Sequence, residues 1–287
     1  MNMEANFYES IDTYYEVAYP FLMKRELENG LFLTILSNIK ENFKHYGQEP
    51  PILTTITEDN EVKLISFRTP PYNQVLSFSL DLRTVDILID ALIVRESELP
   101  GVLGPKAESE RFAKLWSEKQ NLNYKIIMNE RLYKLEEVSE ETLGKRKFKL
   151  GDSTDEDLIL QWGKEFMLEA LPERDKEMIE GSLKRMRNRI SENRIFLLFD
   201  KDKPVSMAQK AGKTPNGIGI NGVYTPPSLR RRGYATECVA KLSQYLLDEG
   251  NNYCFLFTDL SNPTSNSIYQ KIGYYPITDV DEYRFDT

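Results

Sequence analysis

Residues 221–235, with the sequence NGVYTPPSLRRRGYA, combine the residue types that bind a pyrophosphate. Gly233 precedes a long amphipathic segment, and because it has no Cβ, the backbone N–H groups around it can approach an anion closely. The free N–H groups of a first helical turn and the positive end of the helix dipole attract phosphate oxygens. Arg230, Arg231 and Arg232 bring positive charge to the same place. Composition alone leaves a second interpretation open, a solvated basic turn that caps an ordinary helix.

This segment resembles a signature of the GNAT superfamily of N-acetyltransferases. The pattern Arg230-x-x-Gly233-x-Ala235 is similar to that family's (Gln/Arg)-x-x-Gly-x-(Gly/Ala) motif. The preceding residues 223–226 resemble the family's fourth strand where it enters the pyrophosphate loop.

A second segment, residues 262–274 with the sequence NPTSNSIYQKIGY, is similar to a second GNAT signature. Asn262 stands seven residues before Tyr269, and a Gly-aromatic pair follows. The clear resemblance covers about residues 146–285, half of the chain. More loosely, the whole chain resembles bacterial predicted acetyltransferases that are built from two GNAT-like halves in tandem.

The resemblance implies acetyl-CoA as cosubstrate and no metal. The pyrophosphate would lie on the backbone amides of Arg231, Arg232, Gly233, Tyr234, Ala235 and Thr236. The pantetheine arm would pair like a strand with Val223 and Thr225, on either side of Tyr224. Asn262 would hydrogen-bond the cofactor arm, with Asn266 as a further cofactor contact. A plain N-cap is the alternative role for Asn262.

The resemblance also implies a direct attack of an amine on the acetyl thioester, with backbone N–H donors for the oxyanion. Tyr269 would act as general acid for the departing thiolate, or else it is a buried aromatic that holds its helix to the sheet. Many family members carry a carboxylate base on the fourth strand, but residues 217–224 contain none. Asp259 and Glu169 are the nearest carboxylate candidates. A turn or surface role is the alternative for both Asp259 and Glu169, and a water relay is the alternative to a carboxylate base.

Other motif-like features have plainer explanations. Gly217, Gly219 and Gly222 form a literal G-x-G-x-x-G, but they lie inside a strand-like run and open no helix, so they predict no dinucleotide site. Cys238 and Cys254 are expected to be buried small apolar residues.

The single histidine, His45, is expected to be a surface or helix-cap residue, which makes a His-based nucleophile triad improbable. The basic run at residues 184–189 predicts a solvated helix face, with the lining of an acidic substrate's entry as the alternative.

The spacing of apolar residues predicts alternating helices and strands in both halves of the chain. Two helices are expected within the helical stretch at about 8–44, and further helices at 85–94, 107–118, 154–169, 175–191, 232–248 and 263–272. Strands are expected at 52–56, 62–67, 74–79, 124–135, 146–150, 195–200, 205–212, 218–224, 253–258, 274–277 and 283–285, with a short apolar segment at 99–103. This order predicts an α/β class (α+β mixed sheet). With the resemblance, it predicts the GNAT acyl-CoA N-acyltransferase fold, as two GNAT-like domains in tandem.

The length of 287 residues is itself a prior for two domains. The polar, weakly periodic residues 136–145 suggest the boundary, with a degenerate GNAT-like domain at 1–138 and the catalytic domain at 139–287. The N-terminal half has no counterpart of the phosphate loop, because residues 79–84 contain no glycine to admit a phosphate. We expect this half to have lost acetyl-CoA binding.

The net charge of −8 is unevenly distributed. Residues 145–287 contain 22 basic and 21 acidic residues, whereas residues 1–144 contain 15 basic and 24 acidic ones. An acidic N-terminal half would favour a cationic acceptor if it borders the cleft. The acidic balance also argues against a nucleic-acid partner.

The N-terminus lacks the pattern of a signal peptide, and no apolar run approaches the ~20 residues that a membrane helix needs. We therefore expect a cytoplasmic protein with no membrane partner, and a homodimer is left open.

The leading hypothesis is an N-acetyltransferase that moves an acetyl group from acetyl-CoA to a primary amine of a small molecule or protein. One alternative is a non-catalytic acyl-CoA sensor or scaffold, which the missing fourth-strand carboxylate suggests. A less favoured alternative is an aminoacyl transferase that uses aminoacyl-tRNA.

Overall fold

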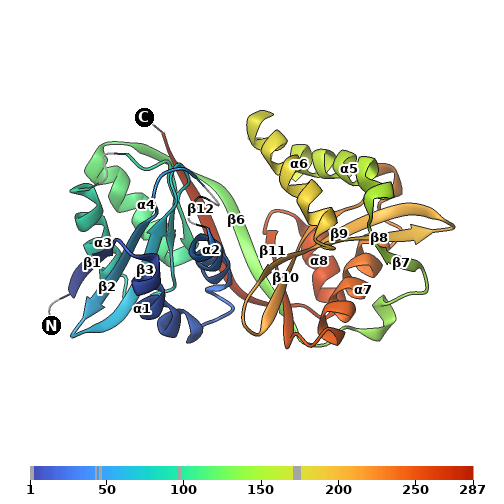
Figure 1. Cartoon of the computed structure of the whole chain (residues 1–287), viewed down its shortest axis with the longest axis horizontal. Coiled ribbons are helices and arrows are strands. Elements are labelled where there is room, and N and C mark those ends of the chain that lie inside the picture. The colour runs from blue at the N-terminus through green and yellow to red at the C-terminus, as the bar shows by residue number, and fades with distance from the viewer. Residues whose placement is uncertain (1–2, 43, 45–46, 96–97, 171–175, 287) are drawn as a thin grey trace. The chain divides into compact units, whose positions relative to one another are not determined.

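The computed structural model describes residues 3–42, 44, 47–95, 98–170 and 176–286 (Figure 1). His45 lies outside the described residues. The chain forms two compact units. Unit 1 comprises Met1–Leu132, Thr258–Ser261 and Ile277–Thr287, and unit 2 comprises Tyr133–Phe257 and Asn262–Pro276. Strands β6 (Asn123–Leu135) and β12 (Tyr275–Asp286) each contribute residues to both units.

Unit 1 contains a mixed sheet in the order β1-β2-β3-β4-β5-β12-β6. Its other strands are β1 (Met3–Tyr8), β2 (Ile52–Glu58), β3 (Glu61–Arg68), β4 (Gln74–Leu76) and β5 (Gly101–Pro105). Strands β4 and β5 are parallel, and β5 and β12 are antiparallel.

Helices cover both faces of this sheet because successive strand residues point to opposite sides. They are α1 (Ile11–Met23), α2 (Gly30–Glu41), α3 (Arg83–Ile93) and α4 (Lys106–Gln120). Leu53, Ile65 and Phe67 pack in one core with α1 and α2. Ile56 and Leu64 belong to a second core with α3 and α4.

Unit 2 repeats this architecture with the strand order β11-β10-β9-β8-β7. These are β7 (Lys147–Leu150), β8 (Ile195–Asp200), β9 (Lys203–Lys213), β10 (Gly217–Tyr224) and β11 (Tyr253–Asp259). The helices are α5 (Glu156–Ala170), α6 (Lys176–Ser191), α7 (Tyr234–Asp248) and α8 (Pro263–Ile272). One core contains residues of α5 and α6, and the other contains residues of α7 and α8. The mixed α/β class predicted from the sequence is confirmed.

Two details of the fold differ from the predicted elements. Strand β1 was not predicted, and it precedes the two helices of the helical stretch predicted at 8–44. The Asn29 side chain donates a hydrogen bond to the Leu22 carbonyl oxygen (3.1 Å) between these helices. The two terminal strands predicted are one strand, β12. The acidic residues within β12 suggest a break between two strands when the sequence is considered alone. In the structure the strand continues, because Asp279 accepts a hydrogen bond from Arg131 and Asp281 accepts one from Asn129.

Candidate functional site

The first component of the candidate site is a local gap in strand pairing. Strands β10 and β11 are parallel. Their pairing begins where Gly217 lies opposite Tyr253 and ends where Gly219 lies opposite Phe255. On its other side, β10 pairs with β9 with an irregularity between Asn221 and Tyr224. The backbone groups of the last β10 residues are therefore directed to a side that β11 does not fill. An extended ligand arm can pair with backbone groups of this kind.

The second component is the loop between β10 and α7. After a short 3-10 turn at Pro227–Leu229, Arg231 has φ of 62° and Gly233 has φ of 78°. Gly233 is the N-cap of α7, and because it has no side chain it supplies no capping hydrogen bond to the first turn. A Cβ at Gly233 would meet no atom of the described residues within 4 Å, so the space beside this glycine is open. Backbone N–H groups at such an end suit an anion.

The three arginines of this loop have different surroundings. The Arg230 guanidinium donates to the Thr225 carbonyl oxygen (2.9 Å) and makes two bonds to the Glu169 carboxylate (2.7 and 2.6 Å). Arg231 and Arg232 are exposed, and neither forms an ion pair with a described carboxylate. Arg230 therefore joins the loop to α5, whereas its two neighbours keep their charge available to a ligand.

The sequence prediction missed a second link between α5 and the end of β10. The Tyr224 hydroxyl donates a hydrogen bond to Glu165 Oε2 (2.8 Å). Burial, and then the bond to Glu165, raises the pKa of Tyr224 to about 12. Hydrogen bonds from Gln161 and Tyr224 lower the pKa of Glu165. The i, i+4 spacing of Gln161, Glu165 and Glu169 on a predicted helix was the sequence signal that could have identified this face.

Tyr269 lies on α8 within the core of unit 2. Its ring centroid is 6.5 Å from that of Tyr133 and 6.0 Å from that of Tyr274. Burial raises the pKa of Tyr269 to about 12, so its hydroxyl keeps its proton at neutral pH. Among the described residues, this hydroxyl has no hydrogen-bond partner. It is thus a protonated donor, as a general acid must be.

Asn262 and Asn266 have structural partners at the start of α8. Asn262 Oδ1 accepts from the Ser265 backbone N–H (3.1 Å), which makes Asn262 the N-cap. The Asn266 side-chain amide donates to the Asn262 carbonyl oxygen (2.7 Å) and accepts from the Tyr133 hydroxyl (3.0 Å). The N-cap role that the sequence left open for Asn262 is present. The predicted cofactor contacts of both residues stay predictions.

The two carboxylates predicted as bases have different environments. Glu169 is engaged by Arg230 in unit 2. Asp259 belongs to unit 1, where its carboxylate accepts from the Ser261 backbone N–H (2.7 Å). Burial, together with Glu282 and Asp259, raises the pKa of Glu130 on β6 to about 7. The sequence prediction missed Glu130, because nothing in β6 alone indicates which carboxylates lie near it.

The described residues give no signal of a metal site or of a membrane-spanning helix. These residues contain no group of three or more His, Cys, Asp or Glu side chains that could hold a metal ion. None of the helices described is long and apolar enough to cross a membrane.

Comparisons with known proteins agree with this geometry. Residues 156–274 match the model of the acetyltransferase (GNAT) family. The match covers α5 to α8, and so contains both the phosphate-loop candidate and Tyr269. A comparison of the sequence with curated proteins gives no match.

Solved structures with the same fold include proteins that match nearly the whole chain. A GNAT-family acetyltransferase from Colwellia psychrerythraea is 12% identical, with a TM-score of 0.58, over 99% of this chain and 100% of that one. A GCN5-related N-acetyltransferase from Sphaerobacter thermophilus is 12% identical, with a TM-score of 0.59, over 98% and 95%. A Drosophila protein, also 12% identical, reaches a TM-score of 0.66 over 99% of both chains.

At these identities the structural matches establish the fold, whereas the family model identifies the domain. Residues 156–274 therefore form a domain of the acetyltransferase (GNAT) family, and the whole chain shares its fold with these solved structures.

Proposed function

We propose that the protein is an N-acetyltransferase that transfers the acetyl group of acetyl-CoA to a primary amine in a ternary complex. The observation that supports this most is the open first turn of α7. There Gly233 adopts a positive φ and has open space where a Cβ would lie, and the two arginines before it form no ion pair with a carboxylate among the described residues. A pyrophosphate satisfies the N–H groups, the helix dipole and the positive charge together.

The rest of the cofactor would follow from this anchor. The arm, which contains amides, would pair with the backbone of Val223 on the side of β10 that β11 leaves unpaired, and with that of Thr225 just after the strand, whose carbonyl oxygen also accepts from Arg230. Hydrogen bonds of this kind would direct the thioester along the gap between β10 and β11. The arm would thus lie as an added strand, with affinity from main-chain hydrogen bonds.

The proposed reaction balances as a direct displacement. The amine nitrogen forms a bond to the acetyl carbon, and the carbon–sulfur bond then breaks. Tyr269 donates its phenolic proton to the departing thiolate. Burial raises the pKa of Tyr269 to about 12, so the phenol carries this proton at neutral pH. The attacking nitrogen gives up its proton to a water molecule or a carboxylate, and the phenolate is reprotonated from solvent.

A primary-amine panel with detection of free coenzyme A thiol tests the activity. We expect thiol release that depends on an amine and decreases strongly in Tyr269→Phe. Binding of acetyl-CoA without release for any amine would instead support the acyl-CoA sensor, the second candidate. The specific observation that favours a sensor is the absence of a carboxylate in β10.

A further inference from the structure

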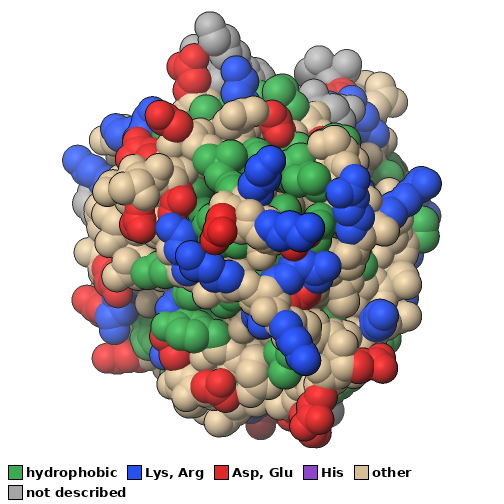
Figure 2. Space-filling view, turned by 90° about the vertical axis from the view of Figure 1, so that its right-hand side faces the viewer, with side chains coloured by type: hydrophobic (Ala, Val, Ile, Leu, Met, Phe, Trp, Pro, Cys, Tyr) green, Lys and Arg blue, Asp and Glu red, His purple; other side chains and the backbone are tan. Residues whose placement is uncertain are grey.

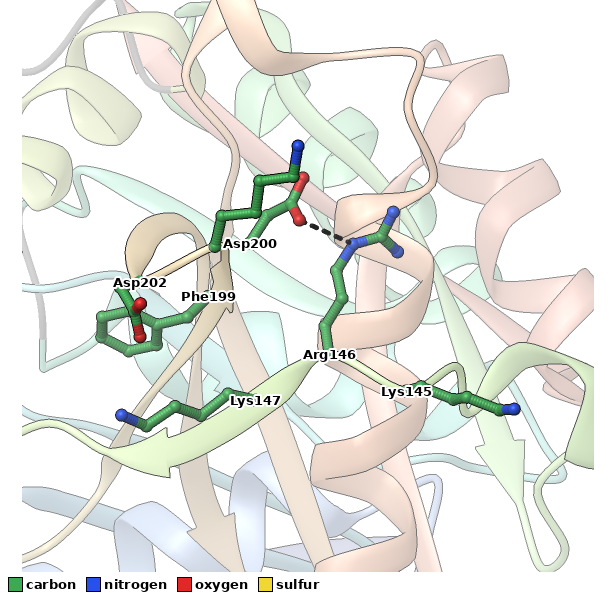
Figure 3. A pocket seen from close by; sticks show the side chains of 7 residues that line it. Lys145, Arg146, Lys147, Phe199, Asp200 and Asp202 are labelled. Carbon is green, nitrogen blue, oxygen red and sulfur yellow. Dashed lines mark ion pairs between the residues drawn. The ribbon is translucent and has the colours of Figure 1, made fainter.

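Three arginines are partly buried in the described part of unit 2, and one of them lacks a carboxylate partner. Arg146, which lines a hollow of about 550 Å³ (Figure 3), donates a hydrogen bond to the Glu237 carboxylate. Arg194 pairs with Glu192 (3.4 Å). Arg189 forms no ion pair with a carboxylate among the described residues. Because a buried charge without a counter-ion is costly, Arg189 is a candidate for binding an anion.

Arg189 stands in the last turn of α6 and contacts the sheet through Gln209 of β9. Its Nη1 donates a hydrogen bond to Gln209 Oε1 (2.9 Å), and Gln209 is only 1% exposed. This bond uses one of the five N–H donors of a guanidinium. The other donors and the charge have no carboxylate to satisfy them in the part of the chain that the structure describes.

The surroundings of Arg189 are positively charged. Burial, and then the charges of Arg194 and Arg185, lower the pKa of Arg189. Glu192 acts in the opposite direction, but its carboxylate pairs with Arg194 (3.4 Å). Figure 2 shows lysine and arginine side chains gathered on a face of unit 2. An anion at Arg189 would therefore be attracted by several positive charges.

Gln209 connects Arg189 to the part of β10 where the pairing with β9 is irregular. Gly222 lies in this part with φ of 56°, and a Cβ there would be 2.2 Å from Gln209 Nε2. In the proposed complex the cofactor arm runs from the phosphate loop past Thr225 and then Val223, so its acetyl end would lie near Gly222. One side chain, that of Gln209, thus separates Arg189 from the strand segment where the acetyl group would be transferred.

We propose that Arg189 binds a carboxylate of the acceptor, and that the acceptor is a primary amine of the amino-acid class. The inference rests on the proposed function, because the proposed path of the cofactor places the acetyl end. A planar guanidinium pairs with a carboxylate through two parallel hydrogen bonds and holds it in one orientation. The amine at the other end of the acceptor then reaches the thioester. The acidity of the N-terminal half predicts a cationic acceptor instead, and a panel of amines decides between the two.

The test measures thiol release at saturating acetyl-CoA with straight-chain amino acids from glycine to 6-aminohexanoate, each compared with its primary amide. The diamine 1,4-diaminobutane represents the cationic class. For the best chain length we expect kcat/KM to be about ten-fold higher for the acid than for the amide, because hydrogen bonds to charged groups contribute more than neutral ones. This ratio should decrease as salt increases.

Substitutions on α6 test the role of Arg189 in this preference. In Arg189→Gln the ratio should fall below about two-fold, with the KM for acetyl-CoA unchanged. Arg189→Lys keeps the charge without the planar pair of donors, so it should give an intermediate ratio, and it provides the test if the glutamine variant does not fold. The matched control is Arg187→Gln, which removes an exposed arginine that pairs with Glu156 (3.2 Å) and should keep the full ratio.

The outcomes separate the inference from the function beneath it. Equal turnover of acids and amides, or faster turnover of the diamine, overturns the inference and leaves acetyl transfer intact. A full ratio that persists in Arg189→Gln also overturns it, because the carboxylate must then bind elsewhere. An equal loss for acids and amides in that variant overturns it too, since the role of Arg189 would then be structural. No thiol release with any amine overturns the proposed function itself.

Discussion

The Arg230 guanidinium and the Glu169 carboxylate face each other in a two-pronged ion pair, with N–O distances of 2.7 and 2.6 Å. A third bond from Arg230 reaches the Thr225 carbonyl oxygen (2.9 Å). One side chain thus connects the end of β10, the phosphate-loop candidate and helix α5. We infer that Arg230 positions the loop, and that the exposed neighbours Arg231 and Arg232 carry the charge for the ligand.

Removing the carboxylate charge of Glu169 should therefore weaken acetyl-CoA binding by the loop, with little effect on the stability of the fold. For Glu169→Gln we expect the KM for acetyl-CoA to increase about two- to five-fold, because a half-exposed ion pair contributes about 0.2–1 kcal/mol. The free energy of unfolding should change by less than about 1 kcal/mol. The control is Glu156→Gln, also on α5, which removes an exposed ion pair with Arg187 of α6 and should leave KM unchanged. Equal KM effects in the two variants would contradict this role.

Tyr269 and Tyr274 provide a matched pair of buried phenols in unit 2. Tyr269→Phe should lower kcat about 10²-fold with little change in stability, because general acid catalysis contributes roughly that factor and the hydroxyl has no described partner. Tyr274→Phe removes a hydrogen bond with Ser243 (2.8 Å) and should cost about 1 kcal/mol of stability without a comparable loss of kcat. Steady-state kinetics and thermal unfolding of both variants measure the contrast. If Tyr269→Phe has the same kcat as the parent, Tyr269 is not the general acid.

The sequence was sufficient to predict the site segments that are local in the chain. Gly233, the arginines and the helix after them are consecutive, and the Asn262–Tyr269 spacing lies within one helix. Their element types follow from short-range rules, and the structure has them on the predicted loop and helix.

Short-range rules could not predict contacts between segments that are distant in the chain. The Tyr224–Glu165 bond joins residues 59 positions apart, and the Arg146–Glu237 pair joins residues 91 apart. Nothing in either segment alone specifies these partners, since sheet order and helix packing determine them. The edge strand β1, which pairs with β2, was missed although residues 3–7 alternate between apolar and polar side chains.

Glu130 should make the stability of the protein depend on pH. Its folded-state pKa of about 7 exceeds the ordinary value of 4.5, so the folded protein holds this proton more tightly than the unfolded chain does. The stabilisation is fully present below pH 4.5 and is lost as the pH rises to about 7. Glu130→Gln should remove this dependence and should be more stable than the parent at pH 8, by at most ~3 kcal/mol.

Chemical denaturation at pH 5 and pH 8 measures this effect. Glu118→Gln, at an exposed position of α4, is the control and should keep the parent's pH dependence. A Glu130→Gln variant with the same pH dependence as the parent would show that Glu130 does not titrate as described.

Cys238 and Cys254 should be unreactive in the folded protein. Both thiols are fully buried, and burial raises the pKa of each to about 12, so almost no thiolate is present at pH 8. A colorimetric thiol reagent should detect no fast-reacting group in the native protein and two after denaturation. Rapid native labelling of either cysteine would contradict the packing of the α7–β11 core.

Acetyl-CoA binding at the open first turn of α7 is the central claim, and calorimetry tests it most directly. Gly233→Glu places a carboxylate where the pyrophosphate would lie, and Gly250→Glu is the matched control, since both glycines have positive φ and open space around them at opposite ends of α7. We predict that the parent and Gly250→Glu bind acetyl-CoA with similar affinity, and that Gly233→Glu binds at least about 100-fold more weakly. The claim is contradicted if the parent does not bind, or if Gly233→Glu binds as the parent does.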